Sequence, residues 1–80
     1  MTREEVYAKL LSVFKDVFDD RRIKIDDNTT SNNIVGWDSL MHIQLIDAVQ
    51  DEFNVKFAVE DVANLKNVGE LVNLILKLSK

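Results

Sequence analysis

Apolar residues recur at spacings of three and four near the start of the chain, which is the period of one face of an α-helix. The stripe consists of Val6, Leu10, Val13, Phe14 and Val17. Thr2 and Glu5 fit a capping box, in which each side chain bonds the backbone N–H of the other residue. The pattern therefore predicts a helix from about Arg3 to Phe18 whose apolar stripe faces a core.

Residues 19–37 break this period and form a long connection rich in Asp, Asn, Thr and Ser. The short polar side chains of these residue types bond to nearby backbone and favour turns. A connection of this length is unusual in a small domain and is often functional. Five apolar side chains are expected to pin it to the helices: Ile23, Ile25, Ile34, Val35 and Trp37.

The acidic part of this connection can be compared with a calcium-binding EF-hand loop. Such a loop starting at Asp26 requires glycine at its sixth position and glutamate at its twelfth. The chain has Ser31 and Trp37 at these positions, which excludes an EF-hand.

A second apolar stripe predicts a helix over residues 39–53. Its expected buried face is Leu40, Ile43, Ile46, Val49 and Phe53, with Leu45 and Ala48 at the margins. The side expected to face water carries Gln44, Asp47, Gln50 and Asp51. Asn54 is the expected terminator.

Two further helices complete the pattern. A short one is expected from Val59 to about Asn64, with Val62 and Leu65 facing inward. The last begins after Asn67, which forms a weaker capping-box match with Glu70. Its stripe consists of Val68, Leu71, Val72, Ile75 and Leu78. We therefore expect one all-α domain over residues 1–80, a four-helix bundle with a short third helix and a long loop between the first two.

Composition narrows the class of protein. The 80 residues include no cysteine, so the chain has neither a disulfide nor a metal site built on thiolates. Met1 to Leu11 holds four charged residues, which is unlike a signal peptide, and no apolar run is long enough to span a membrane. We expect a monomeric, cytoplasmic protein.

Negative charge is concentrated in one part of the sequence. The net charge is −4, from 14 acidic and 10 basic residues. Between Asp38 and Asp61 there are six acids and one base, whereas the rest of the chain carries eight acids and nine bases. Negative potential repels nucleic acids and anionic membranes and attracts basic protein surfaces. The expected partners are proteins with basic patches, not nucleic acid or membrane.

The most informative stretch is Gly36-Trp37-Asp38-Ser39-Leu40, where the long connection meets the second helix. Asp38 is a good N-cap, because its carboxylate can accept bonds from the unpaired N–H groups of the first turn. Ser39 then takes the first helical position, with its hydroxyl facing outward at the helix end that favours phosphate. Gly36 is expected to leave room for close backbone approach, and Trp37 and Leu40 to hold the junction in the core.

This motif, followed by an amphipathic helix ending in Asp51-Glu52-Phe53 in an acidic chain of 80 residues, resembles the acyl carrier protein family. The resemblance covers nearly the whole chain, including the spacing of the helices. In that family a phosphopantetheinyl transferase joins 4′-phosphopantetheine to the serine of the motif as a phosphodiester. The resemblance maps this serine onto Ser39 and implies a carrier of acyl thioesters in fatty-acid, polyketide or another specialised biosynthesis, not an enzyme.

The resemblance also implies two groups of site residues. Docking to the transferase and to basic patches on acyl-loading and acyl-processing enzymes is assigned to Asp38, Leu40, Met41, Asp47, Asp51, Glu52, Glu60 and Asp61. An apolar cavity among the second, third and fourth helices is assigned to Val49, Val62, Leu65, Leu71 and Leu74.

The second helix departs from the pattern of housekeeping fatty-acid carriers. Those proteins usually have an acid directly after Asp-Ser-Leu and more acids along this helix. Here Met41 and His42 follow the motif, and Gln44 and Gln50 are neutral. The departure indicates a specialised carrier.

His42, the only histidine, stands three residues after Ser39 and on nearly the same helical face. A catalytic Ser–His pair is disfavoured, because neither an oxyanion loop nor an orienting third group accompanies it. We interpret His42 as a surface residue near the phosphodiester, and we expect no metal site. Two alternatives stay open: an aminoacyl or peptidyl carrier loaded by an adenylating ligase, and a helical interaction module that carries nothing.

Overall fold

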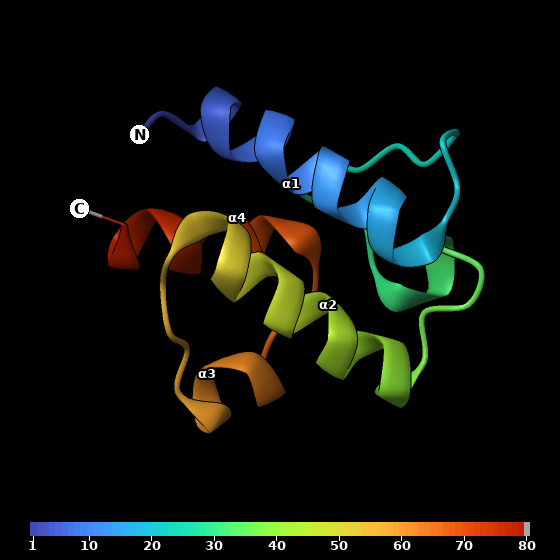
Figure 1. The fold of residues 1–80 in the computed structure, drawn as a ribbon. Coiled ribbons are helices and arrows are strands. Elements are labelled where there is room, and N and C mark those ends of the chain that lie inside the picture. Colours follow the sequence, from blue (N-terminus) through green and yellow to red (C-terminus); the bar gives the residue numbers. More distant parts are fainter. Residues whose placement is uncertain (80) are drawn as a thin grey trace.

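The described part of the chain, residues 1–79 of the computed structural model, is built from α-helices and contains no strand (Figure 1). The elements are α1 (Arg3–Phe18), a short 3₁₀ turn η1 (Ser31–Asn33), α2 (Ser39–Phe53), α3 (Val59–Ala63) and α4 (Val68–Leu78). The predicted all-α fold with a short third helix and a long first connection is confirmed. Lys80, which belongs to the predicted domain, lies outside the described residues.

Local sequence signals determine where the first two helices begin and end. The Thr2 hydroxyl accepts a bond from the Glu5 N–H at 3.1 Å, and the Glu5 carboxylate accepts one from the Thr2 N–H at 2.8 Å. The predicted capping box is therefore present at the start of α1. α1 and α2 end at Asp19 and Asn54, whose left-handed backbones (φ 49° and 54°) stop the helix.

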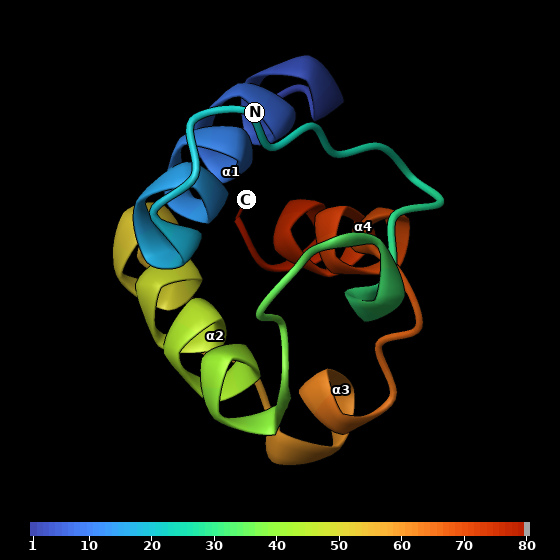
Figure 2. The same cartoon turned by 90° about the vertical axis from the view of Figure 1, so that its right-hand side faces the viewer.

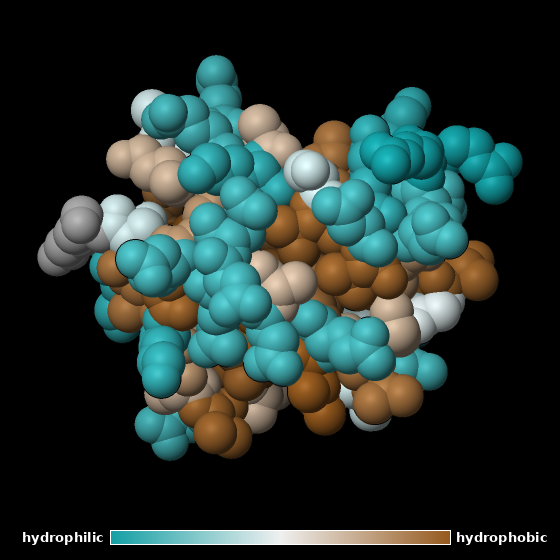
Figure 3. Space-filling model, viewed as in Figure 1, coloured by the Kyte–Doolittle hydropathy of each residue, from teal (hydrophilic) through white to brown (hydrophobic). Residues whose placement is uncertain are grey.

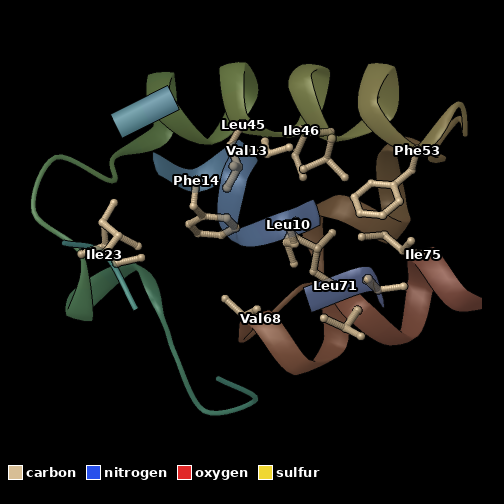
Figure 4. Close-up of a cluster of buried hydrophobic side chains, with 14 residues drawn as sticks. Leu10, Val13, Phe14, Ile23, Leu45, Ile46, Phe53, Val68, Leu71 and Ile75 are labelled. Atoms are coloured by element: carbon tan, nitrogen blue, oxygen red, sulfur yellow. The ribbon is translucent and has the colours of Figure 1, made fainter. Parts of the chain in front are cut away.

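The core lies where α1, α2 and α4 meet. Side chains from these three helices point toward one another in Figure 4, including Leu10, Phe14, Leu45, Phe53 and Ile75. Burying a side chain of this size stabilises the fold by about 1.5–3 kcal/mol. α1 contacts both α2 and α4, and α1 begins on the side of the molecule where α4 ends (Figure 1).

The buried face of α2 differs from the predicted one. Leu40 and Ile43 are 64% and 61% exposed, whereas Leu45, expected at the margin, is fully buried. The buried stripe is Leu45, Ile46, Val49 and Phe53. Half-buried His42 continues this stripe toward the helix start, so a pattern that counts only apolar residues selects the wrong face at that end.

Two smaller differences concern side chains expected to be inside. Val35 is 97% exposed, because it follows buried Ile34 at the turn after η1 and faces the opposite way. Leu78, the last residue of α4, is also exposed. Of the other anchors predicted in the connection, Ile23 is buried, and Ile25 and Trp37 are half-buried against the core.

The long connection is fixed to the start of α4. Figure 2 shows it running from the end of α1 past α4 before it turns back to α2. Val68 N–H donates to the Thr29 carbonyl at 2.9 Å, and Gly69 N–H donates to the Asp27 carbonyl at 3.1 Å. The connection thus supplies acceptors for N–H groups that a helix cannot satisfy at its own N-terminus.

The predicted cap of α4 is confirmed in one half and changed in the other. The Asn67 side chain accepts from Glu70 N–H at 2.9 Å, as a cap should. The Glu70 carboxylate does not bond the Asn67 N–H and instead accepts from the Lys66 N–H at 2.8 Å. This contact closes the α3–α4 connection against the first turn of α4.

A side-chain network links the long connection between α1 and α2 to α1 and α4. The Arg3 guanidinium donates to the Asp27 carboxylate at 2.8 Å and to the Asn73 side-chain oxygen at 2.7 Å, and the Tyr7 hydroxyl donates to Asp27. Burial and the bond to Asp27 raise the pKa of Tyr7 to about 12. Hydrogen bonds from Tyr7 and Arg3 lower the pKa of Asp27.

No helix formed by residues 1–79 combines the length and the apolar character needed to cross a membrane.

Candidate functional site

The start of α2 has the geometry that the sequence predicted for it. Asp38 has an extended backbone, and its carboxylate accepts a bond from the Met41 N–H at 2.9 Å. The Asp38 carbonyl accepts from the His42 N–H at 2.8 Å, which closes the first turn. Ser39 is the first residue of the helix and is exposed. Its hydroxyl is therefore accessible, beside the end of the helix that favours negative charge.

Gly36 has a different role from the one expected. Its φ of +88° is a left-handed value that L side chains rarely adopt, and a Cβ atom there would have no neighbour within 4 Å. Glycine is needed for the backbone turn, not for close approach.

Trp37 anchors the junction to the core. Its ring lies 5.4 Å from Phe14 in a T-shaped contact and 5.9 Å from Phe18, both on α1. Its indole N–H donates to His42 Nδ1 at 3.2 Å, and the two rings are nearly parallel at 6.0 Å. Leu40, the second predicted anchor, is exposed and contributes no such packing.

A cleft of about 520 Å³ opens beside Ser39. The start of α2 forms one wall with Trp37, His42 and Ile43. The opposite wall comes from η1, the α3–α4 connection and the start of α4, with polar Thr30, Ser31, Lys66 and Asn67 and apolar Leu65, Val68 and Leu71. The cleft therefore offers both apolar surface and hydrogen-bonding groups.

The five residues assigned to an acyl cavity are not all brought to this cleft. Leu65 and Leu71 line it. Val49 is fully buried in the packed core, and Val62 and Leu74 are half-buried away from the cleft lining. Sequence reasoning did not find the polar wall, because its residues come from segments that meet Ser39 only through the fold.

The residues assigned to docking lie mainly on the surface. Asp47, Asp51 and Glu52 are exposed on α2, and Glu60 and Asp61 are exposed on α3. Asp38 and Leu40 are exposed beside Ser39, whereas Met41 is half-buried. Figure 3 shows apolar surface interspersed with hydrophilic surface on the face that α2 crosses. The surface around Ser39 thus combines negative charge with exposed apolar side chains.

Metal ligands do not gather in the described part of the chain. Within residues 1–79 no group of three His, Asp or Glu side chains is placed to hold a metal ion.

The chain is similar in sequence to known acyl carrier proteins. Residues 8–75 match the family model described as "Phosphopantetheine attachment site". The acyl carrier protein of Cyanidium caldarium is 28% identical over 76 residues, which cover 95% of this chain and 88% of the relative. The meromycolate extension acyl carrier protein of Mycobacterium leprae is 28% identical over 80 residues, covering 100% of this chain and 70% of that protein.

A solved structure gives the same result for the fold. The solution NMR structure of holo acyl carrier protein from Geobacter metallireducens superposes with a TM-score of 0.85 and 39% sequence identity, covering 90% of this chain and 83% of that one. Since the family model spans most of the residues and the fold agrees, the chain belongs to the phosphopantetheine-attachment-site family, as an acyl carrier protein.

Proposed function

We propose that this chain carries acyl groups as thioesters on a 4′-phosphopantetheine arm attached to Ser39. The observation that carries the assignment is the exposed Ser39 on the first turn of α2, in the lining of the cleft. The arm supplies a thiol on a flexible tether, which holds the acyl group and raises its effective concentration at a partner's active site.

The residues around Ser39 fit such a group. A phosphodiester on this hydroxyl would lie beside the helix N-terminus, where the backbone N–H groups of the first turn favour an anion. Asp38 caps the helix through Met41 and leaves the serine side chain free of that task. The cleft gives the arm apolar walls for its methylene groups and polar groups for its amides.

The hydrogen bond made by His42 favours a carrying role over catalysis. Its Nδ1 accepts a hydrogen bond from the Trp37 indole, so that nitrogen has no carboxylate to orient the ring as a general base for Ser39. We place the chemistry on the arm and on the partner enzymes.

Partner enzymes are proposed to dock on the exposed face around Ser39. Asp47, Asp51 and Glu52 provide negative charge for basic patches on the transferase and on acyl-loading and acyl-processing enzymes. Leu40 and Ile43 add apolar contact area next to the serine. We further propose that residues 1–80 act as one carrier domain, since α1, α2 and α4 share one core.

We also propose a specialised pathway. Helix α2 carries neutral Met41, Gln44 and Gln50 where the resemblance leads us to expect acids. The Mycobacterium leprae relative is named for meromycolate extension, a dedicated role within the same family. Modified wild type should support a housekeeping ketosynthase poorly, and a Met41→Asp, Gln44→Glu, Gln50→Glu variant should support it better. Equal rates for the two proteins would contradict a specialised role.

The attachment site is tested by incubating the chain with a broad-specificity phosphopantetheinyl transferase and coenzyme A. Intact mass should show one added arm, and fragmentation should place it on Ser39. Ser39→Ala should gain nothing, whereas Ser31→Ala, which alters another serine of the same cleft, should be modified normally. An arm on any other serine, or no arm at all, would overturn the assignment.

A second candidate is a carrier of short polar acids, such as aminoacyl groups loaded by an adenylating ligase. The polar wall formed by Thr30, Ser31, Lys66 and Asn67 favours it. Backbone chemical shifts would be compared between proteins loaded with an eight-carbon acyl group and with an aminoacyl group. Shifts at Leu65 and Leu71 with the first cargo alone indicate an acyl carrier, and shifts at the polar wall with the second alone indicate an aminoacyl carrier.

A further inference from the structure

His42 is held in a defined position by Trp37. The Trp37 indole N–H donates to His42 Nδ1 at 3.2 Å, and the two ring planes are inclined by only 19°. Trp37 is itself packed against Phe14 and Phe18 of α1. The imidazole therefore has a fixed neighbour that is anchored in the core.

This contact selects one neutral form of the imidazole. An indole N–H can only donate, so the nitrogen that faces it must be an acceptor without a proton. The proton of the neutral ring is then on Nε2. Among the hydrogen bonds within residues 1–79, the His42 ring takes part in one, through Nδ1. The Nε2–H donor is left for another acceptor.

The position of the ring relates this donor to Ser39. Side chains on a helix lean toward its N-terminus and cover the turn that precedes them. His42 does so, since it reaches Trp37, which lies before the N-cap. Ser39 is one turn earlier on the same face, and Ser39, Trp37 and His42 line the same cleft.

We propose that His42 is a positioning residue for the phosphodiester of the arm. Its Nε2–H donates to a non-bridging phosphate oxygen, an anionic acceptor that makes a stronger bond than a neutral one. The bond directs the arm toward the cleft walls. Because the Trp37 indole occupies Nδ1, it is Nε2 that faces the phosphate. The inference rests on the proposed function, because it requires the arm on Ser39.

Two variants of His42 distinguish the effect of its N–H donor from the effect of its aromatic ring. His42→Phe keeps an aromatic ring beside Trp37 but removes both nitrogens, and His42→Gln keeps a side-chain N–H donor. Trp37→Phe keeps the packing on α1 and removes the donor that selects the form of the imidazole. Gln44→Ala, an exposed position of the same helix, is the matched control. Lys66→Gln tests the lysine that lines the cleft as a rival donor.

The test uses the modified full chain, observed by ³¹P NMR of the phosphodiester and by ¹⁵N NMR of the imidazole at mildly alkaline pH, where an imidazole is neutral. Wild type should show Nε2–H imidazole, and its Nε2–H resonance should move downfield when the arm is attached. The ³¹P resonance should shift in His42→Phe and Trp37→Phe, shift less in His42→Gln, and stay at the wild-type position in Gln44→Ala.

An imidazole with its proton on Nδ1, or a ³¹P resonance unaffected by His42→Phe, would overturn the proposal. A shift in Lys66→Gln alone would assign the phosphate contact to Lys66 instead. Circular dichroism checks that each variant is folded. If His42→Phe is unfolded, the ³¹P spectra of His42→Gln and Trp37→Phe, compared with wild type, decide whether His42 positions the phosphodiester. Intact mass is read first: no arm on Ser39 overturns the proposed function as well, whereas an arm with an unchanged ³¹P spectrum overturns only the role of His42.

Discussion

Gly69 and Asp27 lie so close that a Cβ atom on Gly69 would stand 2.9 Å from the Asp27 carbonyl oxygen. The same oxygen accepts the Gly69 N–H at 3.1 Å. Glycine is therefore required at the second position of α4 by the backbone of the long connection. Through this contact the connection, and with it η1 and the wall of the cleft facing Ser39, takes its position relative to α4.

Gly69→Ala should consequently destabilise the fold. The added methyl group meets backbone rather than the end of a flexible side chain, so the connection must move, at a cost of about 1–3 kcal/mol. Urea unfolding followed by circular dichroism measures the loss. Ser12→Ala, at an exposed position of α1, should change stability by less than about 0.5 kcal/mol. Equal stability of Gly69→Ala and wild type would show that the connection is not held there.

Stability at alkaline pH should depend on Tyr7. Burial first, and then the bond to Asp27, raise its pKa from 10 to about 12 in the folded state. The contribution of the phenol to stability is therefore complete below pH 10 and is lost as the pH rises from 10 to about 12. The difference in unfolding free energy between wild type and Tyr7→Phe should shrink over this range. A constant difference would show that the pKa of Tyr7 is not raised in the folded state.

Stability at acid pH should depend on the partner of that bond. The pKa of Asp27 is lowered by hydrogen bonds from Tyr7 and then from Arg3, so its contribution is present above the usual pKa of an aspartate and is lost as the pH falls through the lowered value. Asp27→Asn should unfold with a weaker dependence on pH in the acid range than wild type. The control is Asp26→Asn, next to it in the chain, where only a local turn is affected.

The helix bounds and caps could be predicted because they depend on residues close together in sequence. Thr2 with Glu5 and Asp38 with Met41 are contacts over three residues. The buried face of α2 could not be predicted as well, since polar His42, half-buried and bonded to Trp37, continues the buried stripe toward the helix start.

The cleft was beyond prediction for a different reason. Its polar wall depends on backbone bonds that join residues far apart, from Thr29 to Val68 and from Asp27 to Gly69. Such bonds fix how the long connection lies over α4, and no periodic pattern in the sequence predicts them. Ser39, by contrast, follows from a motif of five adjacent residues, and the structure places it where that motif predicted.

Asp38 is expected to act in two ways that a pair of variants can separate. Asp38→Ala removes the cap on the Met41 N–H and should cost on the order of 1 kcal/mol. Asp38→Asn keeps a capping oxygen and removes the charge. If the transferase recognises the negative charge of Asp38, both variants are modified slowly, although only Asp38→Ala is less stable. Normal modification of Asp38→Asn would limit the role of Asp38 to the cap.

The last prediction concerns the negative charge on α2. Asp47 and Asp51 are exposed, and exposed charges act mainly on the rate of encounter with a partner. Asp47→Lys, Asp51→Lys should therefore slow modification by the transferase at low ionic strength with little change in stability. The effect should fade in salt, because charges are screened over about 8 Å at physiological ionic strength.

The control variant makes the same change of net charge elsewhere. Glu4 and Asp16 are exposed on α1, and Glu4→Lys, Asp16→Lys alters the total charge equally but leaves α2 untouched. If the transferase docks on α2, only the α2 variant loses rate, and the loss appears in kcat/KM. Equal losses in both variants would mean that the total charge alone steers the partner, and that the acidic face beside Ser39 is not a docking surface.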